Sequence, residues 1–65
     1  MIANALKKKL EADVEAAKSD LEVFLRNPIG VAEHIDYIAT AEKKLEHLAH
    51  AEDKLESLQR HFSKY

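Results

Sequence analysis

Histidine and glutamate side chains in the second half of the sequence are the strongest candidates for metal or acid–base chemistry. His47 and His50 stand three positions apart and Glu46 precedes them, so a helix would place two or three of these ligand types on one side. On that helix, however, His50 lies opposite the leucine stripe, which favours a solvated surface. No histidine follows a glutamate at the Glu-x-x-His spacing of bundle di-iron sites. We therefore expect no metal site and no cofactor.

The hydroxyl groups and the remaining titratable groups show no catalytic arrangement. No serine or threonine stands with a histidine and an acid in an order typical of a triad. His34 lies where a turn meets a second helix, so we expect it to cap backbone N–H groups or to face a partner. Glu52 interrupts an apolar stripe, where a buried acid could specify register; the alternative is that Ala51 fills the stripe and Glu52 lies at its edge. We expect no catalytic residues and no enzymatic activity.

Three consecutive lysines, Lys7, Lys8 and Lys9, are the candidate contacts for nucleic acid. They have no interleaved aromatic residue that could stack on bases, and acidic residues follow immediately. The net charge of -2 adds no attraction for phosphate or for anionic lipid. These observations disfavour nucleic acid and favour a solvated face that lies beside acids of the second helix, namely Glu52, Asp53 and Glu56.

The composition is that of long helices. Apolar residues make up 46% and charged residues 34% of the 65 residues, with one glycine, one proline and no cysteine. No run approaches the roughly 20 apolar residues of a membrane span, so we expect no membrane partner. The absence of cysteine and of a signal-like opening predicts a cytoplasmic protein, in the cytoplasm of the host cell if the chain is viral.

Apolar residues recur at helical spacing on both sides of a proline–glycine break. The first stripe predicts a helix over about 3–26 and consists of Leu6, Leu10, Val14, Ala17, Leu21 and Phe24. Pro28 disfavours helical geometry at Asn27, and Gly30 follows, so a turn is predicted over about 27–33. The second stripe predicts a helix over about 34–64 and consists of Ile35, Ile38, Ala41, Leu45, Leu48, Leu55, Leu58, Phe62 and Tyr65. The predicted fold class is all-α: one domain, residues 1–65, folded as a two-helix antiparallel hairpin.

Folding the chain back around Ile29 to Gly30 pairs apolar positions along the whole hairpin and places Leu6 near Leu55. Two helices cover only part of each stripe, and each leucine left in water forfeits about 1 kcal/mol or more. A second chain is the expected cover, and two hairpins that dimerise into a four-helix bundle are the simplest closed arrangement. The expected oligomer interface consists of Leu45, Leu48, Leu55, Leu58, Phe62 and Tyr65.

The turn region contains the most distinctive residues. Ile29 and Val31 would be exposed at a loop unless the bundle end or a docked partner covers them, so Pro28, Ile29, Val31 and His34 form a candidate partner loop. The run Asn-Pro-Ile-Gly-Val-Ala-Glu-His over 27–34, with Ala-Glu-Asp-Lys-Leu-Glu over 51–56, resembles small uncharacterised helical proteins of tailed phages of marine cyanobacteria. That resemblance implies a viral origin and no particular activity.

Three functions are compatible with this pattern. The leading hypothesis is a non-enzymatic protein-interaction module: a homo-oligomeric helical bundle that acts as a small scaffold or adaptor, with itself and another protein as partners. The alternative is a nucleic-acid-binding regulator, similar in architecture to small RNA-binding helical-hairpin dimers, that would use Lys7 to Lys9 together with Lys43 and Lys44. A third hypothesis, a metal-binding or pH-responsive protein, rests on the histidines alone.

Overall fold

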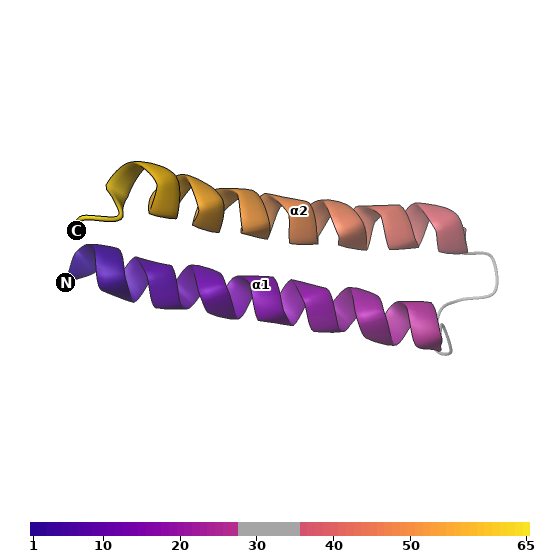
Figure 1. Ribbon diagram of the computed structural model, residues 1–65. Helices are drawn as coiled ribbons and strands as arrows, with labels where there is room; N and C mark the ends of the chain where they lie inside the picture. The colour runs from indigo at the N-terminus through magenta and orange to yellow at the C-terminus, as the bar shows by residue number, and fades with distance from the viewer. Residues whose placement is uncertain (28–35) are drawn as a thin grey trace.

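Two long antiparallel helices form a hairpin in the computed structural model, which describes residues 1–27 and 36–65. Helix α1 spans Ile2–Arg26 and helix α2 spans Tyr37–Phe62, and these described residues contain no strand. The helices lie side by side with both chain ends at one end of the hairpin (Figure 1). Together they form a rod of 48 × 15 × 15 Å. The predicted all-α hairpin is therefore confirmed, whereas its dimerisation into a bundle remains a prediction.

The end of α1 follows from the proline that comes after it. Asn27 has extended backbone angles, φ -154° and ψ 87°, as expected for a residue that precedes Pro28. Its N–H still donates to the carbonyl oxygen of Val23 at 3.0 Å, which closes the last turn of the helix. The first helix thus ends at Arg26, as the sequence predicts.

The start of α2 is fixed by a side-chain cap. The Asp36 carboxylate accepts hydrogen bonds from the N–H groups of Ile38 at 3.0 Å and Ala39 at 3.1 Å, and so satisfies two donors that have no partner within the helix. This cap places the first helical residue at Tyr37, later than the predicted start at about 34. Residues 34 and 35 lie outside the described residues. At its other end α2 stops at Phe62 and not at about 64.

The core of the described hairpin is narrow. Leu10 and Ala51 are its two buried residues, with 5% and 6% of their surface exposed. Because Ala51 is buried and Glu52 is exposed, the alternative in which Ala51 fills the stripe is confirmed. The half-buried apolar residues that flank this core are Ala3, Val14, Ala17, Leu21, Phe24, Ala41, Leu48, Leu55 and Leu58. Across the described ranges, neither helix is long and apolar enough to cross a lipid bilayer.

The pairing register differs from the expected one by about one helical turn. Asp20 contacts Lys44 across the helices, and Leu6 lines a groove with Leu58, three residues beyond the expected Leu55. The reason is the length of the connection. Helix α2 begins only at Tyr37, so each residue of α1 lies beside a later residue of α2 than a tight turn around residues 29 and 30 would place there.

Candidate functional site

The structure divides the predicted oligomer interface into two surfaces. Leu48, Leu55 and Leu58 are half-buried in the hairpin itself, whereas 54% of the Leu45 surface is exposed. At about 100° per residue, Leu45 is turned about 100° from Phe62 around the α2 axis. One straight contact strip therefore cannot contain all the predicted interface residues.

The first surface is an apolar strip on the half of α2 near the loop. We call it the Leu45 seam, and it consists of Ile38, Ala41, Leu45 and Leu48. Ile38 and Leu45 are exposed, and Ala41 and Leu48 are half-buried. The alternating spacing of three and four residues is that of a coiled-coil seam, in which such side chains contact one neighbouring helix. The Leu45 seam can therefore receive a further helix.

The second surface lies where the two chain ends meet. Phe62 and Tyr65 line an open apolar groove with Met1, Ile2 and Leu6. All five residues are exposed, Leu6 the least with 41% of its surface. One lysine side chain stands beside this groove, because the Lys64 ammonium lies 5.8 Å from the centroid of the Tyr65 ring. The groove combines apolar surface with positive charge.

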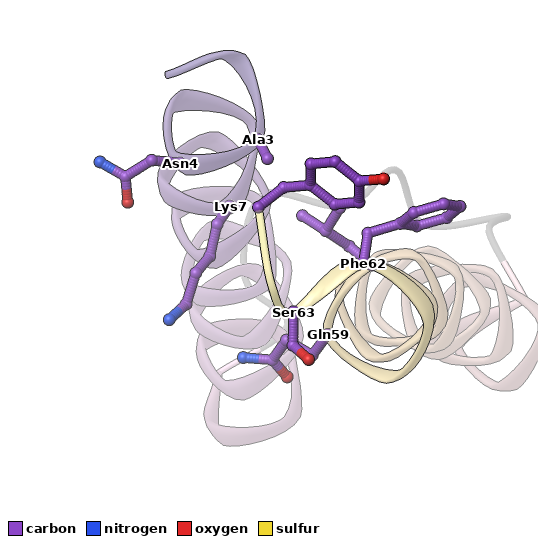
Figure 2. A pocket seen from close by; sticks show the side chains of 8 residues that line it. Ala3, Asn4, Lys7, Gln59, Phe62 and Ser63 are labelled. Atoms are coloured by element: carbon purple, nitrogen blue, oxygen red, sulfur yellow. The ribbon is translucent and has the colours of Figure 1, made fainter.

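A small cavity beside this groove does not suit a cofactor. It is lined by residues of both helices that include Ala3, Lys7 and Gln59. Figure 2 shows Asn4 and Lys7 on the outer side of α1 and the Phe62 ring on the other side of the cavity from Lys7. The cavity volume is about 180 Å³, below the roughly 300–1,000 Å³ of small-molecule sites.

A cross-helix network joins the helices near the loop. The Lys44 ammonium lies 2.8 Å from the Asp20 carboxylate and 5.6 Å from the centroid of the Phe24 ring, and only 26% of the lysine side chain is exposed. The Phe24 ring in turn lies 6.3 Å from the ring of Tyr37. An ion pair, a cation–π contact and an aromatic pair thus converge between α1 and α2. Sequence reasoning missed this network because it depends on the register.

The histidine pair lies on the same side of the hairpin as two acids of α1. His47 and His50 line an open groove with Asp13, Asp20 and Lys54. The floor of that groove consists of small residues, Ala16, Ala17 and Ala51. Nowhere in residues 1–27 and 36–65 do three histidine, cysteine, aspartate or glutamate side chains come close enough together to hold a metal ion. The groove carries charges of both signs.

The consecutive lysines do not form one basic face. At about 100° per residue, Lys7, Lys8 and Lys9 point in three directions around α1. The Lys9 ammonium pairs with Asp13 of its own helix at 2.7 Å, and Lys7 lines the small cavity with Gln59. Lys9 therefore pairs with an acid of its own helix and not with the expected acids of α2.

The candidate partner loop belongs to the segment between the two described ranges. Pro28, Ile29, Val31 and His34 lie outside the described residues. Comparison of the chain with protein-family models, with curated proteins and with solved structures finds no match.

Proposed function

We propose that the protein is a non-enzymatic interaction module that associates with itself through the Leu45 seam and acts as a small helical scaffold or adaptor. The observation that supports this proposal most is the unusually large exposed surface of the hairpin. The resemblance to cyanophage proteins would make the module phage-encoded, and the cytoplasm is the compartment that we propose for it.

The exposed surface exceeds what a folded chain of this mass retains. The hairpin exposes 5355 Å². A folded monomer of 7.4 kDa is expected to expose about 4,200 Å². The excess is about 1,100 Å², and a stable interface of standard size buries about 800 Å² on each partner. Association of two hairpins would therefore remove most of this excess.

The exposed surface is also of the kind that interfaces bury. Ten large apolar side chains are exposed in the described hairpin, and only two residues are buried. Ile38 and Leu45 stand in register along the Leu45 seam, so a second helix would cover both at once. Burying one such leucine stabilises a complex by roughly 1.5–3 kcal/mol. The seam is therefore the surface that we expect association to cover first.

Nucleic-acid binding is less well supported than self-association. Of the lysines that it would use, Lys9 is paired with Asp13 and Lys44 with Asp20. Lys7 and Lys8 point in different directions, so a phosphate backbone cannot follow them along one face. Retention of RNA on the native protein at low salt and its loss at high salt would favour this alternative.

A pair of aspartate variants tests the proposal. Leu45→Asp places a charge in the Leu45 seam, and Val23→Asp places the same charge at an exposed apolar residue of α1 that is turned about 140° from the buried Leu10. The native chain and the Val23→Asp control are expected to elute with the mass of two chains in size-exclusion chromatography with light scattering. Leu45→Asp is expected to elute as one chain, because the charge would have to be desolvated in the dimer.

Circular dichroism on the same samples separates dissociation from unfolding. A native chain that is fully helical and monomeric at high micromolar concentration would contradict the proposal. A Leu45→Asp variant that remains dimeric would show that association uses another surface.

A further inference from the structure

Charge is segregated along the hairpin in a way that the net charge of -2 conceals. We call residues 1–10 and 57–65 the basic tip. These two segments contain no aspartate or glutamate, and they meet at one end of the hairpin (Figure 1). The basic side chains of the tip are Lys7, Lys8, Lys9, Arg60 and Lys64.

The next turns of both helices carry the opposite sign. We call residues 11–17 and 50–56 the acidic band, which contains Lys54 as its one lysine or arginine. The acids of the band are Glu11, Asp13, Glu15, Glu52, Asp53 and Glu56. Two of them reach back to the tip, since Asp13 pairs with Lys9 and Glu56 with Arg60. Lys7, Lys8 and Lys64 have no ion-pair partner among residues 1–27 and 36–65.

The Leu45 seam lies away from the tip. Lys44, which precedes Leu45, contacts Asp20 in the second half of α1, so the seam stands level with the part of α1 that approaches the loop. Two hairpins joined at this seam could lie with their basic tips at the same end or at opposite ends. The apolar contact alone does not choose between these two arrangements.

Electrostatic repulsion distinguishes the arrangement with tips at the same end from the arrangement with tips at opposite ends. Packed helices lie about 8–10 Å apart, which is comparable to the screening length of about 8 Å at physiological salt, so charges on neighbouring helices still interact. With tips at the same end, the basic side chains of one tip would stand beside those of the other, and each acidic band would stand beside an acidic band. With tips at opposite ends, the two tips are separated by much of the length of the rod, and this tip-to-tip repulsion disappears.

We infer that the Leu45 seam receives a second copy of this chain in the inverted direction, so that the two basic tips lie at opposite ends of the dimer. This inference rests on the proposed self-association. The excess of exposed surface supports a second copy of the chain as the partner, and the segregation of charge supports the inverted direction of that copy.

A distance between spin labels tests the direction of the second copy. The chain has no cysteine, so Asn4→Cys provides a single labelling site in the tip, at an exposed residue. At about 1.5 Å per residue along the helix, opposite tips place the two labels more than about 30 Å apart. Tips at the same end place them less than about 30 Å apart, because at most three spacings of about 8–10 Å between packed helices separate α1 of one copy from α1 of the other.

Light scattering and a seam variant accompany this measurement. A long distance in a sample with the mass of two chains supports the inference, and a short distance in such a sample overturns it while leaving self-association standing. A monomeric mass overturns the proposed function and the inference together. Adding Leu45→Asp to the labelled Asn4→Cys chain is expected to abolish the dipolar coupling. A coupling that persists in this double variant would assign the pairing to a different surface and overturn the inference.

Discussion

The half of the hairpin near the loop and the half that carries the basic tip are held together by different means. Near the loop, Asp36 caps α2, and Lys44 joins Asp20 and Phe24 across the helices. At the tip, α1 begins without a side-chain cap, and large apolar residues such as Ile2 and Phe62 remain exposed. The first half has specific polar and aromatic contacts across the helices, whereas the second has the buried Leu10 and Ala51 together with exposed apolar surface at its end.

This difference predicts that stability is unevenly distributed along the rod. Segments with few buried contacts and uncapped backbone groups open more readily than segments with many. The first turns of α1 and the last turns of α2 are therefore expected to exchange their amide hydrogens faster than the turns around Asp20 and Lys44. Three experiments test this difference between the two halves, and they follow in order of decreasing expected effect.

Removing the buried leucine near the tip is expected to have the largest effect. Leu10→Ala truncates the one large side chain that is buried among the described residues. Such substitutions lower the free energy of unfolding by about 2–5 kcal/mol. Thermal denaturation at fixed protein concentration measures the loss, and Leu25→Ala is the matched control because Leu25 is exposed. Equal losses for both variants would contradict the assignment of Leu10 to the core.

Removing the cap of α2 is expected to have an intermediate effect. Asp36→Ala leaves the N–H groups of Ile38 and Ala39 without their acceptor, which costs about 0.5–2 kcal/mol. Asp36→Ser retains a capping oxygen and is expected to recover most of that loss in urea denaturation. If the serine variant is as destabilised as the alanine variant, the cap does not contribute as described.

The ion pair across the helices is expected to have the smallest effect. A double-mutant cycle of Asp20→Asn and Lys44→Met isolates the coupling between the two charges. The Asp20 side chain is half exposed, so we expect a coupling of about 0.2–1 kcal/mol that weakens at high salt. The pair Glu22 and Arg26, within α1, is the control for a contact that does not join the helices. A coupling that does not respond to salt would argue against an electrostatic origin.

The sequence was sufficient to predict the two helices and the end of the first. Pro28 disfavours helical geometry at the residue before it, and Asn27 has the extended backbone angles that this restriction favours. The burial of Ala51 in place of Glu52 was one of two open alternatives, and helical spacing alone could not decide it. The residue types along the chain thus predict the two helices, but they do not predict how the helices pack against each other.

The register and the division of the interface depended on packing. A shift of one turn moves Leu6 from Leu55 to Leu58. Leucine contacts leucine in either register, so the apolar pattern does not distinguish the two registers. The contact between Asp20 and Lys44 exists only in one of these registers. The stripe of α2 likewise could not show which leucines α1 covers, and only the structure separates the half-buried Leu48 from the exposed Leu45.

The mass of the native chain in solution shows directly whether two hairpins associate. Sedimentation equilibrium over a hundredfold range of concentration gives this mass without a matrix or a label. Self-association predicts twice the chain mass of 7.4 kDa at the upper concentrations and a fall toward 7.4 kDa on dilution. A chain that stays at 7.4 kDa throughout, with undiminished helicity, would contradict the account.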